Sequence, residues 1–192
     1  MFWGNALTTF EHESLSAPML QFLQIIVKFF LDEQIPYMLS GSMAMSIYTL
    51  PRAARDFHFV VHLQQKDIDK LVKFFEKGYY CDADAVKDAI STHGMFNVID
   101  HASGFKADFM ILKNEPYRQT EFSRKKLITF FDIPVYIVSP EDLLLSKLIW
   151  IQELQSNLQM EDIKNLSEID SLNWGYINEW AEKLGLNTFS LF

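Results

Sequence analysis

The stretch Tyr37-Met38-Leu39-Ser40-Gly41-Ser42 decides the fold of this chain. Its apolar residues predict a buried strand, and Gly41-Ser42 predicts a tight turn into a helix that ends before Pro51. Backbone N–H groups at such a helix start, together with a serine hydroxyl, suit phosphate oxygens. Because glycine is common in strand-to-helix turns, the neighbouring segments decide whether this turn has that role.

A second strand follows, and it opens with an acid. Residues 56–63 carry the sequence DFHFVVHL. Side chains alternate along a strand, so Asp56 and His58 project to one face, about 6.6 Å apart, near enough to share an ion or to pair. His62 lies about 13 Å from His58, too far to join the same ligand shell, and we expect it to be solvated or hydrogen-bonded.

A third apolar stretch, residues 106–112, contains the lone acid Asp108. A carboxylate among apolar neighbours is costly unless it is paired or binds a metal ion. Two interpretations therefore stand at this point. Asp108 is a metal ligand, or it forms an ion pair with Arg52, Arg55 or Lys106.

The remaining patterns predict helices around a mixed sheet. We expect helices at 18–34, 43–50 and 67–77, one capped by Asp82 or Asp84 that ends near 90, and three more at about 140–154, 161–169 and 174–184. Expected strand pairs are 96–99 with 106–112, and 127–131 with 135–138. This order predicts an α+β fold in one domain, residues 1–192, with an α/β core at 18–138 and a helical C-terminal part at 139–192 packed on it.

Composition limits the classes of partner. The net charge of −8 argues against non-specific DNA binding, and an apolar content of 49% supplies a large core. A single cysteine excludes an internal disulfide and a Cys-based zinc cluster. The N-terminus lacks the pattern of a signal peptide, and the longest apolar run is too short to cross a membrane, so we expect a cytoplasmic protein.

The order of these motifs resembles the nucleotidyltransferase superfamily that includes DNA polymerase β. Within it, the chain is most similar to the small prokaryotic abortive-infection and antitoxin-like group. The resemblance runs from residue 35 to about 184. It rests on Leu39-Ser40-Gly41-Ser42, Tyr48, Arg52-Ala53-Ala54-Arg55-Asp56, Asp108, the segment 138–148 and Asp162-Ile163.

The resemblance implies a reaction and a set of residues for it. It implies metal-dependent transfer of a nucleoside monophosphate from an NTP to a hydroxyl acceptor on RNA, a protein or a small molecule. The implied catalytic and metal-binding residues are Asp56, His58 and Asp108, with Mg²⁺ or Mn²⁺ as the ion. The implied phosphate contacts are Gly41, Ser42, Arg52 and Lys147, although Lys147 also fits a solvent-facing helix lysine.

Two residues depart from the family pattern. His58 stands where the pattern has a second acid, and Ala54 stands where a threonine is common. A carboxylate can bridge two Mg²⁺ ions, whereas a neutral imidazole has one lone pair and prefers softer ions. Three interpretations of the site follow. It binds nucleotide without catalysis, or it works with one ion such as Mn²⁺ or another transition metal. In the third, it is a structural remnant in which Asp56 and His58 are paired.

The alternative function is a degenerate nucleotide- or partner-binding module of toxin–antitoxin or regulatory type, with a protein partner encoded nearby.

Overall fold

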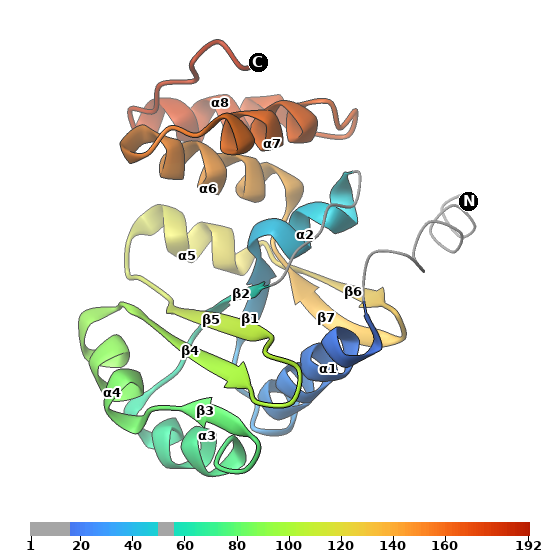
Figure 1. Cartoon of the computed structure of the whole chain (residues 1–192). Helices are drawn as coiled ribbons and strands as arrows, with labels where there is room; N and C mark the ends of the chain where they lie inside the picture. Colours follow the sequence, from blue (N-terminus) through green and yellow to red (C-terminus); the bar gives the residue numbers. More distant parts are fainter. Residues whose placement is uncertain (1–15, 50–55) are drawn as a thin grey trace.

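A computed structural model describes residues 16–49 and 56–192 of the chain (Figure 1). In these residues, seven strands form one mixed sheet in the order β3-β4-β5-β2-β1-β7-β6. The strands are β1 (Tyr37–Ser40), β2 (Asp56–Val61), β3 (Tyr79–Cys81), β4 (Met95–Asp100), β5 (Lys106–Ile111), β6 (Lys126–Phe130) and β7 (Ile133–Ile137). The short β1 is central and buried along its whole length, as an apolar strand between two neighbours must be.

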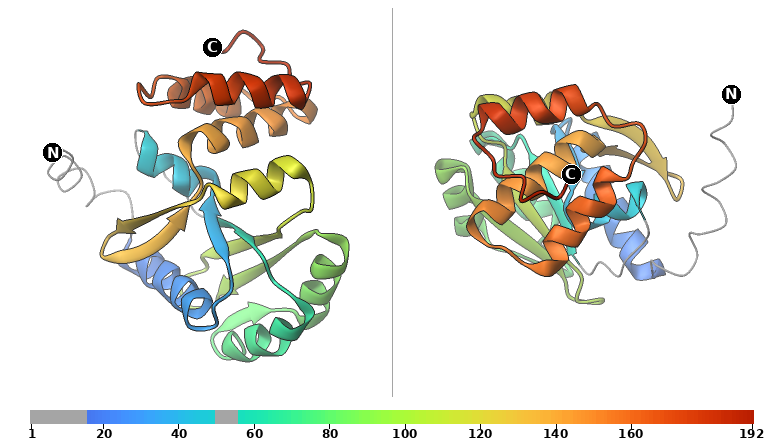
Figure 2. Two further views of the ribbon diagram at one scale, coloured as in Figure 1. Left: turned by 180° about the vertical axis from the view of Figure 1, so that it is seen from behind. Right: turned by 90° about the horizontal axis from the view of Figure 1, so that it is seen from above.

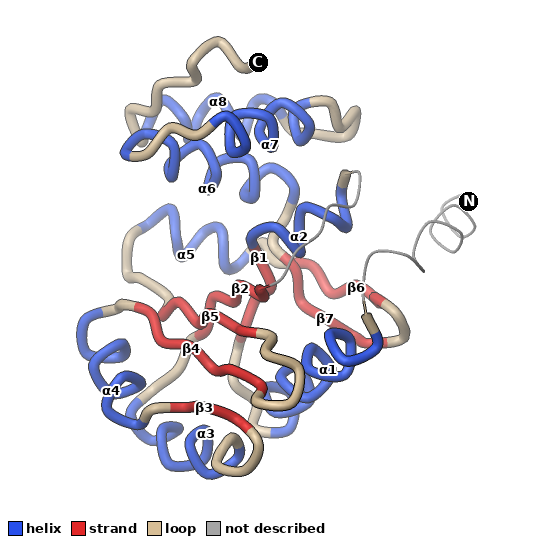
Figure 3. The backbone as a smooth tube through the Cα atoms, viewed as in Figure 1, coloured by secondary structure: helices blue, strands red, loops and turns tan. Residues whose placement is uncertain are grey.

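Helices cover both faces of the sheet (Figure 3). The helices are α1 (Ala17–Asp32), α2 (Gly41–Tyr48), α3 (Ile68–Phe74), α4 (Ala83–Thr92), α5 (Pro116–Ser123), α6 (Pro140–Glu153), α7 (Asn157–Ser167) and α8 (Trp174–Lys183), with a 3₁₀ turn, η1 (Gln65–Asp67), before α3. One core packs α1, α3 and α4 against one face of the sheet. A second core joins the other face to α2, α5 and the three C-terminal helices.

The C-terminal helices lie together beyond α2, on the side away from α1 (Figures 1 and 2). Helix α6 contacts both α7 and α8, and α2 contacts α6 and α7. Ser139 caps α6 by accepting a hydrogen bond from the backbone N–H of Asp142, and Pro140 occupies the first turn. This start of α6 follows the sequence prediction.

The predicted α+β class is confirmed, and most elements lie within a few residues of their expected bounds. The short strand β3 was not predicted, and no bounds were expected for helix α5. Strand β3 has three residues, too few to show an alternating pattern. The start of α2 differs as well: the helix begins at Gly41, so Ser42 lies in its first turn and does not cap it. The division of the chain at residue 138 stays a prediction.

None of the helices in residues 16–49 and 56–192 combines the length and the hydrophobicity that a bilayer crossing requires.

Candidate functional site

The predicted site residues of β2 and β5 come together in the middle of the sheet, at the end where these two strands begin. Strands β1 and β2 are antiparallel, which places Ser40 opposite His58. Strands β2 and β5 are parallel, which places Asp56 beside Lys106 and His58 beside Asp108. These four side chains of β2 and β5 share one face, because the alternate residues Phe57 and Phe59 are buried in the core on the other face.

A lysine ammonium group lies between the two carboxylates. Nζ of Lys106 is 2.9 Å from Oδ2 of Asp108 and 3.7 Å from Oδ2 of Asp56. The hydrogen bond to Asp108 is the largest cause that raises the pKa of Lys106, so its positive charge is held more firmly. The ion pair of Asp108 with Lys106, one of the two interpretations drawn from the sequence, is therefore present.

Asp108 is buried, with only 5% of its surface exposed. Its Oδ2 atom faces both Lys106 and Nε2 of His58, which is 3.4 Å away. Its Oδ1 atom has no hydrogen-bond partner among the described residues. A buried oxygen without a partner costs about 1–3 kcal/mol, so this atom is a point at which a bound donor or cation would be favourable.

Gly41 brings the start of α2 against the same cluster. Its φ angle is +68°, and a Cβ atom at this position would overlap Nδ1 of His58 and lie 3.0 Å from its Cβ and Cγ atoms. A side chain is therefore excluded at position 41 on two independent grounds. The imidazole of His58 fills the space between the turn at Gly41 and the carboxylate of Asp108.

The start of α2 has the properties of an anion-binding end. Its first turn contains no acidic residue, and Ser42 lies in that turn. The carbonyl oxygen of Ser42 accepts a hydrogen bond from the hydroxyl of Ser46, 3.0 Å away, which secures the first turn. The helix dipole, positive at this end, favours a negatively charged ligand.

The other two predicted phosphate contacts have different outcomes. Arg52 lies outside the described residues. Lys147, on α6, is 7% exposed, and its Nζ atom is 2.7 Å from Oδ2 of Asp162 and 3.3 Å from Oε1 of Gln159. The alternative of a solvent-facing lysine is therefore wrong, and its role toward phosphate stays a prediction.

The described residues do not fit a centre for two divalent ions. In residues 16–49 and 56–192, no group of three or more His, Cys, Asp or Glu side chains is placed to hold a metal ion. Lys106 supplies a positive charge close to both Asp56 and Asp108, and His58 stands where the family pattern has its second acid. The buried Oδ1 of Asp108, which has no hydrogen-bond partner among the described residues, is an atom of this cluster that would favour a cation.

A buried polar network that the sequence motifs did not reveal connects the helices above the site. Asp142 on α6 is fully buried, and its Oδ2 atom accepts hydrogen bonds from Nε of Arg124 and from the hydroxyl of Ser139. Its Oδ1 atom accepts a hydrogen bond from the hydroxyl of Tyr176 on α8. Asp142 and Arg124 are 18 residues apart in the sequence, so no local pattern indicates that they meet.

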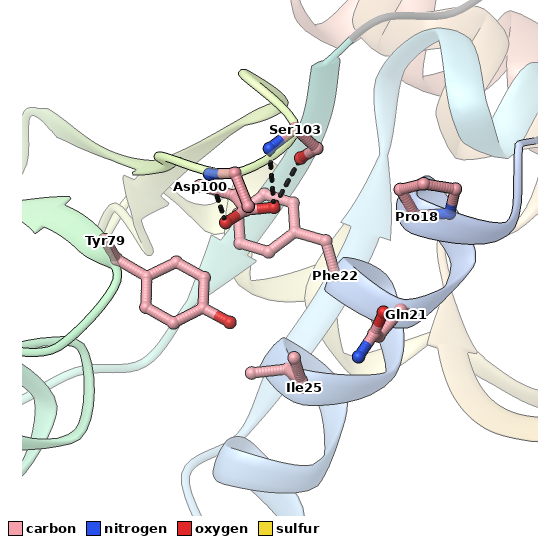
Figure 4. Close-up of a pocket in the computed structure, with 8 residues that line it drawn as sticks. Pro18, Gln21, Phe22, Ile25, Tyr79, Asp100 and Ser103 are labelled. Atoms are coloured by element: carbon pink, nitrogen blue, oxygen red, sulfur yellow. Dashed lines mark hydrogen bonds between the residues drawn. The ribbon is translucent and has the colours of Figure 1, made fainter.

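A pocket of about 350 Å³ lies elsewhere, between α1 and the turn that joins β4 to β5 (Figure 4). Phe22 and Tyr79 line it with stacked rings, 5.8 Å apart between centroids, and the carboxylate of Asp100 accepts hydrogen bonds from Ser103. None of the predicted site residues lines this pocket. It opens on the face of the sheet that α1 covers, opposite the face that carries Asp108.

Comparisons with known proteins agree with this geometry at the level of the fold. No protein-family model matches the chain, and no curated protein matches it. Solved structures match it over most of its length. ANT(2'')-Ia in complex with adenylyl-2''-tobramycin has a TM-score of 0.58 at 13% identity, over 88% of this chain and 98% of that one.

Two further structures agree. The lincosamide antibiotic adenylyltransferase LnuA, with lincomycin bound, has a TM-score of 0.55 at 16% identity, over 81% of this chain and 99% of that one. An antigenic nucleotidyltransferase-like protein from Paracoccidioides brasiliensis has a TM-score of 0.53 at 14% identity, over 88% of this chain and 90% of that one. The chain has the nucleotidyltransferase fold. The resemblance drawn from the motifs is thus confirmed for the superfamily fold.

The position of the cluster agrees with the motif order on which the resemblance rests. That order is a strand followed by a Gly-Ser turn, with acids on two later, neighbouring strands, and β1, β2 and β5 have these features. Among the described residues, the cluster departs from the family pattern at His58, and Lys106 lies close to both of its acids. The signal for Lys106 was present in the sequence, since it is two residues before Asp108 and therefore on the same face of β5.

Proposed function

We propose that this protein binds a nucleoside triphosphate at the turn between β1 and α2 and acts as a regulatory or partner-binding module on a nucleotidyltransferase fold. The phosphates would contact the backbone of Gly41 and the hydroxyl of Ser42 at the positive end of α2. Arg52 and Lys147 remain proposed phosphate contacts.

Two of the structural neighbours support the choice of ligand. The structure of ANT(2'')-Ia contains an adenylylated aminoglycoside, and LnuA is an adenylyltransferase. Both proteins thus handle an adenylyl group on the fold that this chain shares. At 16% and 13% identity, LnuA and ANT(2'')-Ia show that the fold is shared. That this chain binds a nucleotide at its own site is our proposal.

The contacts of Lys106 with both carboxylates are the main support for a protein that does not catalyse ordinary two-ion nucleotidyl transfer. Two-ion transfer depends on carboxylates that are free to hold divalent cations at the attacking and leaving oxygens. Here the ammonium group of Lys106 lies 2.9 Å from Asp108 and 3.7 Å from Asp56. Both acids are therefore already neutralised in part by the protein itself.

A second candidate is the transfer of a nucleoside monophosphate to a hydroxyl acceptor, with Mg²⁺ or Mn²⁺ as cofactor. The unpaired, buried Oδ1 atom of Asp108 favours it, because such an atom can accept the proton of an attacking hydroxyl. The acceptor would be RNA, a protein or a small molecule. A toxin–antitoxin partner and a cytoplasmic location also stay predictions.

Calorimetric titration with ATP, GTP, CTP and UTP, with Mg²⁺ and then with Mn²⁺, tests nucleotide binding. We expect saturable binding that Gly41→Ala removes and that the control Gly185→Ala keeps. Gly185 has a similar φ of +62° but no atom within 4 Å of the added Cβ, so it matches the backbone penalty alone. Circular dichroism checks that both variants are folded. Binding to none of the four nucleotides would contradict both candidate functions.

Label transfer from an α-labelled nucleotide, assayed with and without cell extract as the source of acceptor, separates the two candidates. The proposed module binds nucleotide without turnover. Transfer by the wild-type protein that Asp108→Asn abolishes would support the second candidate and contradict the first.

A further inference from the structure

We propose that the ammonium group of Lys106 is an internal counter-ion that takes the place of a divalent cation between Asp56 and Asp108 and keeps such cations out. The consequence of this inference is a nucleotide site in which no protein-bound metal takes part, and that consequence rests on the proposed function. Its test measures ion binding alone and is independent of nucleotide.

The position of Lys106 follows from the register of two parallel strands. Asp56 and Lys106 are partners across β2 and β5, and Asp108 is the next residue of β5 on the same face. The lysine is therefore held between the two acids by the sheet itself. Its side chain is 35% exposed, whereas that of Asp108 is 7% exposed, so the ammonium group closes the outer side of the buried carboxylate.

The charges explain why a divalent ion is excluded. Asp56 and Asp108 together carry two negative charges, and Lys106 returns one positive charge, which leaves the three side chains at −1. A divalent cation that entered between the acids would meet the ammonium group at close range, and like charges at such a distance repel, most strongly beside the buried Asp108. To bind there, the ion must first displace Lys106 from both contacts.

His58 also lies against the buried carboxylate. Its Nε2 atom is 3.4 Å from Oδ2 of Asp108, and its ring packs against Gly41. A neutral imidazole adds no negative charge for a hard cation such as Mg²⁺, which prefers oxygen ligands. The substitution of an acid by His58 and the presence of Lys106 therefore act in the same direction.

Removal of Lys106 should uncover a cation site. The Oδ1 atom of Asp108 already lacks a partner, and Lys106→Met would free its Oδ2 atom and that of Asp56 as well. Asp56 and the buried Asp108 would then lose the one lysine that the described residues place between them. Such a pair favours a divalent ion because unpaired buried charge is costly.

The experiment is a titration of the full chain with Mn²⁺ alone, in which electron paramagnetic resonance measures the concentration of free Mn²⁺ at each step. Wild-type protein and the control Lys28→Met, which removes an exposed lysine 2.6 Å from Asp32, should show no saturable binding. Lys106→Met should bind one Mn²⁺ with a Kd at least about tenfold below the highest Mn²⁺ concentration tested, at which the wild type still shows no saturation. Lys106→Met with His58→Asp should bind more tightly still, and Lys106→Arg, which keeps the charge, should behave as the wild type.

Each outcome decides the inference. Saturable Mn²⁺ binding by the wild type, as tight as that of Lys106→Met, would overturn it, and so would the absence of any gain in Lys106→Met. If Lys106→Met does not fold, Lys106→Gln is used, and the Mn²⁺-induced rise of its melting temperature replaces the resonance signal. If the wild type binds no nucleotide, the proposed function is contradicted, but the Mn²⁺ titration still tests the role of Lys106. The failure of one proposal can therefore be distinguished from the failure of the other.

Discussion

The backbone of Gly41 packs against the imidazole of His58, so closely that a Cβ at position 41 would overlap the Nδ1 atom of that ring. The turn that is proposed to hold phosphate and the residue that departs from the family pattern are thus in direct contact. The effects of substitutions at Gly41 and His58 on stability should therefore be coupled.

Gly41→Ala should lower the free energy of unfolding by about 1–2 kcal/mol for the left-handed backbone and by about 1–3 kcal/mol more for the overlap with His58. His58→Ala in the same chain should recover the second part, since it removes the overlapping ring. Urea denaturation of the two single variants and the double variant gives the coupling free energy. Gly185→Ala should show only the first part, and equal losses at both glycines would contradict the contact.

Lys106→Met should destabilise the protein by about 1–3 kcal/mol, because the buried carboxylate of Asp108 loses its charged hydrogen-bond donor. Asp108→Asn in the Lys106→Met background should restore most of this loss by removing the uncompensated charge. Thermal unfolding of the four proteins of this cycle measures the effect. Additive losses in the double variant would show that Lys106 and Asp108 do not interact.

Asp142→Asn should be among the most destabilising single substitutions, at about 3–5 kcal/mol, because it leaves Arg124 without the carboxylate 2.8 Å away and weakens the link to Tyr176. Tyr176→Phe should cost less, about 1 kcal/mol, because it removes one hydrogen bond. An exposed pair is the control: Asp84→Asn, which affects the contact with Lys87 at 3.3 Å, should change stability by about 0.5 kcal/mol or less. Urea denaturation distinguishes these three effects, and equal losses for Asp142 and Asp84 would count against the network.

The thiol of Cys81 should react slowly in the folded protein. Burial is the main cause that raises its pKa from 9.0 to about 11, and Asp82 adds to the shift. At pH 8 little thiolate is present, so alkylation by iodoacetamide should be much faster in urea than in buffer. Because the unfolded chain loses this proton first, the contribution of Cys81 to stability should fall as the pH rises from 9.0 toward about 11. Equal alkylation rates in both states would contradict the burial.

Local patterns predicted most of the fold. Helical periodicity located α1, and the Ser139-Pro140 start located α6, because capping and first-turn preferences act over a few residues. Strand β3 was missed because three residues are too few to show an alternating pattern. Strand alternation predicted that Asp56 and His58 share a face, and the resemblance added Asp108 to them.

By itself, the sequence determined which residues can meet at the site: a glycine-serine turn after a buried strand, and polar side chains on alternate positions of two others. Only the tertiary structure decided the charge of that site. The parallel register of β2 and β5 places Lys106 between Asp56 and Asp108, and the antiparallel register of β1 and β2 places His58 against Gly41. Register depends on packing between distant segments, and a one-residue shift would send each of these side chains to the opposite face of the sheet.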